Sequence, residues 1–326
     1  MRDCTPLMRS RFISIAAVAG AFALCSPAFG GLVIGLTYDG TVVTNFGGNA
    51  SAFQTAFTTA ANNISSQYTD NIHVNINVTT VAGSGTLGAS NTTLFSSTWS
   101  NLRTVVLADK KSADDTTATG AGGSITVADP SAGADTWWVT KAQRKALGMA
   151  SDDLTADGTI TIGSGFTYDY DPSNGITAGS IDIVGVMMHE ISEVMGRIGL
   201  AGGTIGGGPG LTLLDAYSYS GANTRGLGNG AGNSFSIDNG TTLVKAFNNQ
   251  AGLGGDSRDW ASGTNDSFNA FSSSSVVDGL TATDIRELDV LGYDLASVAT
   301  PEPSTGVLLI TALGVGGMLR RRMSLR

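Results

Sequence analysis

Residues 186–197 form the stretch of this chain whose residue types and spacing are best suited to chemistry. They include His189, one of only two histidines in the protein, so chemistry that needs an imidazole is expected here. In a helix, His189 and Glu193 share one face because they are four residues apart. A second face carries an apolar stripe with helical spacing, made of Met187, Ile191, Val194 and Ile198. The spacing predicts a helix that packs on a core and presents polar groups on its other side.

The same stretch reads His-Glu-x-x-Glu and resembles the His-Glu-x-x-His helix of the zincin metalloproteases, with glutamate in place of the second histidine. In that family the first and last residues bind zinc, and the glutamate after the first histidine is the general base. The resemblance implies that His189 and Glu193 are metal ligands and that Glu190 is the catalytic base. Gly196 resembles the glycine at which the metzincin branch turns its chain after the zinc helix.

The third metal ligand is not given by this motif. Metzincins place it ten residues after the first histidine, and that position is Gly199 here. Asp215, at the end of an apolar run that resembles a strand, is the first candidate. Asp256 and Asp259, on a turn-rich segment, are the alternatives. Aspartates at such positions also serve as turn or cap residues, so the choice among the three stays open.

Other readings of nearby charged residues are also open. Glu193 and Arg197 have the spacing of an ordinary surface ion pair, and Arg197 or a backbone amide of an edge strand is a candidate for stabilising an oxyanion. The carboxylates of residues 169–175 suggest calcium, although Asp-Pro and Asn-Gly in the same stretch already explain a turn. His73 alternates with apolar residues, which favours a polar residue on a half-buried strand over a metal ligand.

The surrounding pattern predicts the elements that would position this helix. Strands are expected at 31–36, 72–78, 104–108 and 159–162, and helices at 51–67, from Thr140 to Gly148 and at 281–291. Capping boxes are expected at Thr140 with Gln143 and at Thr281 with Asp284. This order resembles the N-terminal half of zincins followed by the closing helix of matrixin-like members. We therefore expect an α+β, zincin-like fold with a loop-rich C-terminal half.

The first 30 residues resemble a secretory signal peptide, with a basic start, an apolar run at 12–24 and a small-residue exit. Both cysteines, Cys4 and Cys25, lie in this segment. The exported chain is therefore expected to contain neither a disulfide nor a thiolate ligand.

The last residues, 299–326, resemble the PEP-CTERM sorting signal of bacterial exported proteins. Pro301-Glu302-Pro303 is followed by an apolar span at 305–319 and then by Arg320-Arg321-Arg322. This order implies transient membrane anchoring and a sorting machinery as partner, with the arginines on the cytoplasmic side. A plain membrane anchor is the alternative. The domain between the two ends is expected to span 31–298 and to act at the cell surface or outside the cell.

The charge of this middle domain excludes one class of partner. Of the 18 Lys and Arg, three lie in the signal segment and four in the tail, and of the 27 Asp and Glu only Asp3 and Glu302 lie there. The middle thus carries 11 basic against 25 acidic residues, a net charge of about −14. Such an acidic surface argues against nucleic acid as a partner.

The function expected from the resemblance is that of an exported, metal-dependent endopeptidase, with zinc as the first candidate metal and a protein or peptide as substrate. Two carboxylates and one imidazole would nearly neutralise a divalent ion, which favours harder metals than zinc and weakens activation of water. The alternative is therefore a catalytically silent zincin-fold protein that binds a surface or an extracellular matrix.

Overall fold

The computed structural model describes residues 31–228, 232–248, 255–261, 263 and 265–296. The expected signal segment with its two cysteines and the expected sorting segment lie outside the described residues. Within the described ranges, no helix is both long and apolar enough to cross a membrane.

The main sheet of the N-terminal half has the strand order β1-β2-β6-β3. Its strands are β1 (Val33–Tyr38), β2 (His73–Val81), β6 (Gly158–Gly163) and β3 (Gly88–Thr92). The first three run parallel, and β3 is antiparallel to β6 at the end of the order. The predicted strands at 31–36, 72–78 and 159–162 are confirmed, since the alternating Val74, Ile76 and Val78 are buried as expected.

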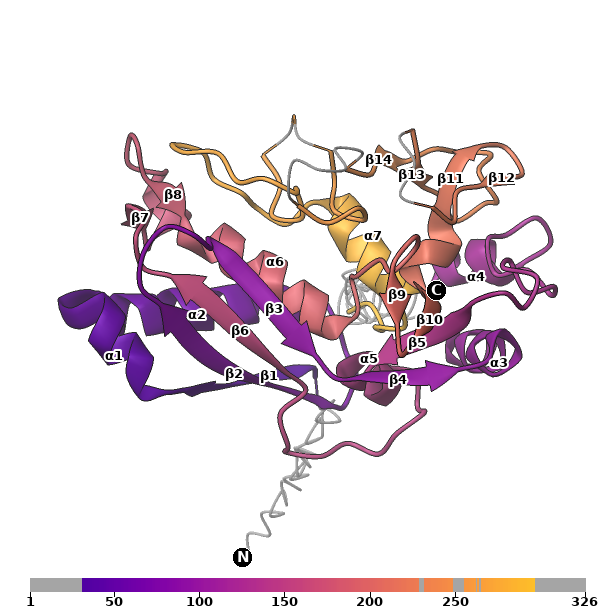
Figure 1. The fold of residues 1–326 in the computed structure, drawn as a ribbon, viewed down its shortest axis with the longest axis horizontal. Helices are drawn as coiled ribbons and strands as arrows, with labels where there is room; N and C mark the ends of the chain where they lie inside the picture. The colour runs from indigo at the N-terminus through magenta and orange to yellow at the C-terminus, as the bar shows by residue number, and fades with distance from the viewer. Residues whose placement is uncertain (1–30, 229–231, 249–254, 262, 264, 297–326) are drawn as a thin grey trace, which may run out of the picture.

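Two long helices pack against this sheet and against each other, α2 (Ala50–Ser65) and α6 (Ile183–Met195). The predicted helix at 51–67 is confirmed as α2, whose buried face includes Phe53, Phe57 and Ile64. Short segments connect these elements: α1 (Gly40–Phe46), η1 (Gly47–Asn49), β7 (Tyr168–Asp169), η2 (Pro172–Asn174) and β8 (Ile181–Asp182). In Figure 1, α6 runs diagonally across the molecule, between β6 and β3 on one side and α7 on the other.

A second sheet has the order β4-β5-β10-β9. It comprises β4 (Leu94–Ser97), β5 (Thr136–Thr140), β10 (Gly208–Thr212) and β9 (Thr204–Ile205), and the helices in the same stretch of chain are α3 (Trp99–Asp109), α4 (Ala113–Thr119) and α5 (Lys141–Ala146). The predicted helix from Thr140 to Gly148 is confirmed as α5, and its N-cap Thr140 accepts a hydrogen bond from the Gln143 amide at 3.1 Å. Only this half of the predicted capping box is formed, and the Gln143 side chain donates to the Leu291 carbonyl.

The strand predicted at 104–108 is wrong, because these residues belong to helix α3. The β-branched run Thr-Val-Val favoured a strand. The helix prevails because the Thr98 hydroxyl accepts from the Asn101 amide and caps the first turn. In addition, Trp99, Leu102 and Val106 are buried together at helical spacing.

The C-terminal half consists mostly of loops and short strands. Its small sheet, of order β12-β11-β13-β14, comprises β11 (Ser218–Gly221), β12 (Thr224–Arg225), β13 (Ser234–Phe235) and β14 (Lys245–Ala246), and is preceded by η3 (Leu214–Tyr217). The predicted last helix is confirmed as α7 (Ala282–Val290), with the Asp284 carboxylate accepting from the Thr281 amide at 2.7 Å. The described residues of both halves contribute to one continuous hydrophobic core, so the molecule is a mixed α/β protein with several sheets.

Candidate metal centre

Helix α6 is fixed at both ends by its own sequence. The Asp182 carboxylate accepts from the amides of Val184 at 3.0 Å and Gly185 at 3.2 Å, which caps the first turn. Gly196 ends the helix in the left-handed conformation, with φ of 117°, as its position after the expected zinc helix predicts. Of the predicted apolar stripe, Met187, Ile191 and Val194 are fully buried, and Ile198 lies beyond the helix end.

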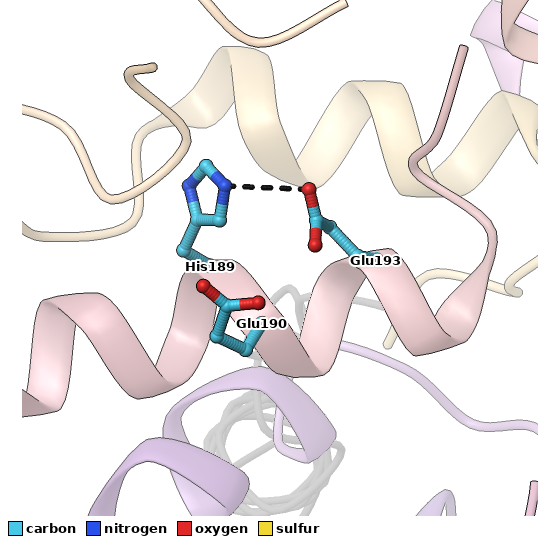
Figure 2. A group of neighbouring side chains, drawn as sticks. All are labelled: His189, Glu190 and Glu193. Carbon is cyan, nitrogen blue, oxygen red and sulfur yellow. Dashed lines mark ion pairs between the residues drawn. The ribbon is translucent and has the colours of Figure 1, made fainter. Parts of the chain in front are cut away.

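A cleft of about 870 Å³ opens beside this helix. Strand β3 lines one side of it and residues 266–272 line another, with His189, Glu190 and Glu193 among the α6 residues in the lining. Figure 2 shows His189 and Glu193 rising from the same side of the helix, with Glu190 on a neighbouring side. The predicted shared face of His189 and Glu193 is thus confirmed.

The ring of His189 is oriented by the C-terminal half of the chain. Its Nδ1 lies 2.9 Å from the carbonyl oxygen of Ser267, which can only accept, so Nδ1 carries a hydrogen. Its Nε2 faces two carboxylates, at 3.4 Å from Glu193 Oε1 and 3.6 Å from Asp259 Oδ1. A neutral imidazole so oriented points a lone pair at two acceptors. The arrangement therefore requires a positive charge between these groups, either a proton on Nε2 or a metal ion.

The charges around the ring favour a positive imidazole in the absence of a metal ion. Burial and the guanidinium of Arg197 lower the pKa of His189, but the carboxylates of Asp259 and Glu193 outweigh them and raise it to about 9. A metal ion at Nε2 would have to displace this proton, so metal binding must release protons.

Glu193 and Arg197 form an ion pair at 3.8 Å, as their spacing predicts, but the pair is buried and not on the surface. The carboxylate of Glu193 is 5 % exposed and accepts from the Ser90 hydroxyl at 2.7 Å. Burial alone would raise the pKa of this carboxyl, but the hydrogen bond and charge of His189, the charge of Arg197 and the hydrogen bond from Ser90 hold it well below its usual range. Glu193 is therefore an ionised carboxylate, which is the state that a metal ligand needs.

Arg197 is buried behind the cleft. It donates to Asp259 Oδ1 at 2.6 Å and to the Ser192 hydroxyl at 2.7 Å, and one nitrogen lies 3.8 Å from Glu193 Oε1. It is not among the described residues that line the cleft, and its exposure is 1 %. This position favours a role in holding the two carboxylates over contact with a substrate oxyanion, and leaves the backbone of the edge strand β3 as the candidate for the latter.

Glu190 lies against β3. Its side chain is so close to Gly88 that a Cβ at that glycine would meet Glu190 Oε1 at 2.3 Å. The residue is 5 % exposed, and its Oε2 has no hydrogen-bond partner within the described residues. Burial, reinforced by the charge of Glu193, raises the pKa of Glu190 well above its ordinary value. A cation bound beside it would lower this pKa toward the range in which a carboxylate acts as a general base.

The structure brings together some of the predicted ligands and not others. Two groups of candidate ligand atoms, each within 4.8 Å of one another, occur among the described residues: His189, Glu190 and Glu193 form one, and Glu193, Asp256 and Asp259 form the other. The alternatives Asp256 and Asp259 therefore meet Glu193 at the cleft, and Asp259 also faces His189.

Asp215, the first candidate for third ligand, belongs to neither group. It lies in η3 and not at the end of a strand, and it is fully buried. Its Oδ1 accepts from Arg258 Nε at 2.8 Å, and its Oδ2 accepts from the amides of Leu200 at 2.9 Å and Thr212 at 2.8 Å. Both oxygens are thus engaged away from His189.

The other predicted polar sites have local explanations. Asp169 accepts from Asp171 and Thr177, and Asp171 accepts from the Ser173 amide, as expected for the turn around η2. Neither aspartate belongs to a group of candidate ligands in the described part of the chain. His73 lies 2.6 Å from Asp152 at a partly exposed position, in agreement with the reading of a polar residue lining a strand.

Sequence reasoning missed three residues of the site: Ser90, Ser267 and Gly88. Ser90 hydrogen-bonds Glu193, Ser267 orients His189, and Gly88 leaves space for Glu190. Each of the three contacts a residue that is distant in the sequence, and none belongs to a spacing pattern. Gly88 and Ser90 could have been found only by predicting that β3 is an edge strand beside α6.

The donor set fits a divalent metal ion. One imidazole nitrogen, with its ring fixed through the opposite nitrogen by a carbonyl, faces carboxylate oxygens from Glu193 and Asp259, and oriented histidines of this kind are typical of metal sites. Comparisons of the chain with protein-family models, curated proteins and solved structures give no match. The chemistry of the site therefore rests on its own residues.

Proposed function

We propose that this protein is an exported metal-dependent peptidase with a zincin-like site. The observation that supports it most directly is the orientation of His189, whose Nδ1 is held by Ser267 while Nε2 faces Glu193 and Asp259 beside an open cleft. A partly buried imidazole that faces two buried carboxylates is a costly arrangement for stability alone, and a divalent ion would satisfy all three groups at once.

In this proposal His189 holds the ion together with Glu193 and Asp259, whose carboxylates lie 3.4 Å and 3.6 Å from its Nε2. Asp256, which forms a group of candidate ligands with Glu193 and Asp259, is the next carboxylate within reach. When bound, the ion supplies Lewis acidity, which polarises a carbonyl and makes a water molecule more acidic. Glu190 accepts the proton of that water and passes it to the leaving amine. Its unpartnered Oε2 leaves this carboxylate free to take up a proton.

The wall of the cleft supports a peptide as substrate. Strand β3 is the last strand of its sheet and lines the cleft along its whole length. Its backbone can pair with an extended chain and can donate to a developing oxyanion at the scissile carbonyl. Arg197 keeps Asp259 and Glu193 in place from behind.

The ligand set also bears on the identity of the ion. Zinc is the first candidate because an imidazole takes part. Since the other donors are carboxylates, a harder divalent metal such as manganese competes with it. Export through the N-terminal segment and sorting through the C-terminal segment, with transient membrane anchoring, complete the proposal and rest on the sequence alone.

A catalytically silent surface-binding or matrix-binding protein is the second candidate, and one observation favours it. Arg197 pairs with Asp259 at 2.6 Å, and the imidazole of His189 has a pKa of about 9, so the cluster can neutralise its own charges without a metal ion. Such a cluster could have lost the metal while keeping the fold.

The deciding experiment is a calorimetric titration of the chelator-treated protein with zinc and with manganese, followed by assay of peptide hydrolysis. A His189→Ala variant serves as the control that lacks the imidazole. The proposal expects saturable binding of one ion per chain and metal-dependent hydrolysis, both lost in His189→Ala. Binding without hydrolysis would support the silent alternative, and wild type that binds neither ion would exclude a metal site on α6.

A further inference from the structure

A buried contact beside the cleft explains why Gly199 has no side chain. A Cβ at Gly199 would lie 2.0 Å from Cγ of Arg258 and 3.0 Å from its Cβ. These distances are far below van der Waals contact, so the stem of Arg258 occupies the space that any other residue at position 199 would need. The segment after α6 and the turn that contains Arg258 are thus in direct contact.

Arg258 is held at this place by Asp215. The two side chains form an ion pair at 2.8 Å between Arg258 Nε and Asp215 Oδ1, with exposures of 2 % and 0 %. Asp215 is in turn fixed by the amides of Leu200 and Thr212, which donate to its Oδ2. The pair therefore ties the turn around Arg258 to the chain that leaves α6.

The residue after Arg258 is Asp259, which faces the imidazole. Its Oδ1 lies 3.6 Å from His189 Nε2 and accepts from Arg197 at 2.6 Å, and its Oδ2 accepts from the Asp256 amide at 3.1 Å. Among the described residues around it, isolated bridges join Trp260 to Phe247 and to Asn269, and the backbone of Asp259 hydrogen-bonds to Asn248 and Asp256. These bonds fix the backbone, and the orientation of the Asp259 carboxylate depends on its contacts with Arg197 and the Asp256 amide.

We propose that the Asp215–Arg258 ion pair, with Gly199 beneath it, is a positioning device that presents Asp259 to His189 and so completes the metal centre from the turn at 255–260. This inference rests on the proposed metal site. In this inference Asp215 is a positioning residue that does not touch the ion. The arrangement also explains why position 199 carries no ligand: the Arg258 side chain occupies the space there, and the next residue, Asp259, supplies the ligand.

The first test removes the ion pair without leaving an unpaired buried charge. The variant Asp215→Asn/Arg258→Met keeps an oxygen for the two amides that Asp215 accepts from and fills most of the volume of the arginine. Lys145 and Asp157 provide a matched control, since they form another buried ion pair, at 2.8 Å, whose carboxylate also accepts from a backbone amide, that of Asn75.

Zinc titration by calorimetry, together with thermal unfolding in chelator, is carried out on wild type, Asp215→Asn/Arg258→Met and the control Lys145→Met/Asp157→Asn. We expect the zinc affinity to fall by about tenfold or more in Asp215→Asn/Arg258→Met, which is the loss typical when a group that orients a metal ligand is removed. In the control it should stay within about twofold of wild type, because that ion pair orients no ligand. Equal zinc affinity in wild type and Asp215→Asn/Arg258→Met, or an equal loss in both variants, would overturn the inference.

The second test addresses Gly199. The variant Gly199→Ala should weaken zinc binding because its methyl group displaces Arg258, whereas Gly40→Ala, at an open position that does not line the cleft, should leave it unchanged. In an Arg258→Ala background the contact with Cγ at 2.0 Å is absent and only that with Cβ at 3.0 Å remains, so Gly199→Ala should weaken zinc binding much less than it does in wild type. The inference fails if Gly199→Ala has no effect in wild type, or if its effect is equally large without Arg258.

The tests also separate this inference from the proposed function. If wild type binds zinc and the variants of Asp215, Arg258 and Gly199 bind it equally well, the metal site stands and the positioning device is refuted. If wild type binds neither zinc nor manganese, the proposed metal site fails and the inference fails with it. If wild type binds manganese alone, the same variants are compared by manganese titration.

Discussion

Asp259 Oδ1 lies 3.6 Å from Nε2 of His189 and 2.6 Å from the guanidinium of Arg197, so one carboxylate connects the candidate metal ligand on the helix with the cation behind it. The arginine neutralises part of the charge that Asp259 and Glu193 bring to the cleft. Because of this arginine, the carboxylates would present less than two full negative charges to a metal ion at this site. The ion would therefore keep more of its positive charge, and lower the pKa of a bound water more, than the number of carboxylate ligands alone suggests.

The first prediction concerns the role of Glu190 as general base, as distinct from the metal-ligand roles of His189 and Glu193. Glu190→Gln should lower peptide hydrolysis by about 100-fold or more while leaving the metal content unchanged, because an amide cannot accept the proton and the residue need not touch the ion. The substitution is nearly isosteric, and Oε2 loses no hydrogen bond among the described residues. Assays of hydrolysis and bound metal on the same preparation check this. Loss of the metal in Glu190→Gln would show that Glu190 is a ligand instead.

The third ligand gives the second prediction. Asp259→Asn should reduce zinc affinity more strongly than Asp256→Asn, because Asp259 faces His189, whereas Asp256 is exposed and belongs only to the group of candidate ligands that lacks the imidazole. Asp259→Asn should also lower the free energy of unfolding by about 3 kcal/mol, since Arg197 loses its closest charge partner. Calorimetric titration and chemical denaturation measure the two effects. A larger loss of zinc affinity in Asp256→Asn would reverse the ranking.

Processing of the ends gives the third prediction. If residues 1–30 and 299–326 are export and sorting signals, protein recovered outside the cell should begin near Gly31 and lack Arg320-Arg321-Arg322. Intact-mass measurement of the secreted form decides this. Recovery of a full-length mass would contradict both assignments at once.

The parts of the fold that the sequence predicted are those determined by local contacts. Helix α6, predicted within 186–197, ends before Gly196 as predicted, because that glycine adopts a positive φ, whereas its start after the capping carboxylate of Asp182 was not predicted. The caps of α5 at Thr140 and of α7 at Thr281 are likewise local. Helix α3 was assigned as a strand because β-branched residues dominate its second half, and its buried stripe depends on contacts with distant residues.

The candidate site was predicted only where it follows the periodicity of one helix. His189 and Glu193 share a face because of helical geometry. Glu193 and Arg197 are buried because the segment around Asp259 covers them. The sequence of the helix alone cannot predict this packing. The choice between Asp215 and Asp259 likewise depends on how two loops fold back on α6. Both are aspartates in turn-rich surroundings, and only their partners, Arg258 for one and His189 for the other, distinguish them.

The pH dependence of stability gives the fourth prediction, at a carboxyl remote from the cleft. Burial and the charge of Asp294 raise the pKa of Asp109 to about 7, from its ordinary value of 3.8. A raised pKa means that the folded protein holds this proton more tightly than the unfolded chain does. The contribution of Asp109 to stability is therefore fully present below about pH 4 and is lost as the pH rises to about 7.

The variant Asp109→Asn removes this dependence, since its amide stays neutral at every pH. Relative to wild type it should be more stable at pH 8 by about 1–2 kcal/mol, less than the full shift implies because the site is only half-buried, and nearly equal to wild type at pH 4. Urea denaturation in chelator at both pH values measures the difference. Asp171→Asn is a control of opposite sign, because the hydrogen bonds from Ser173 lower the pKa of Asp171 and its contribution is present at pH 8. A difference between wild type and Asp109→Asn that is the same at pH 4 and pH 8 would show that Asp109 titrates alike in the folded and unfolded chains.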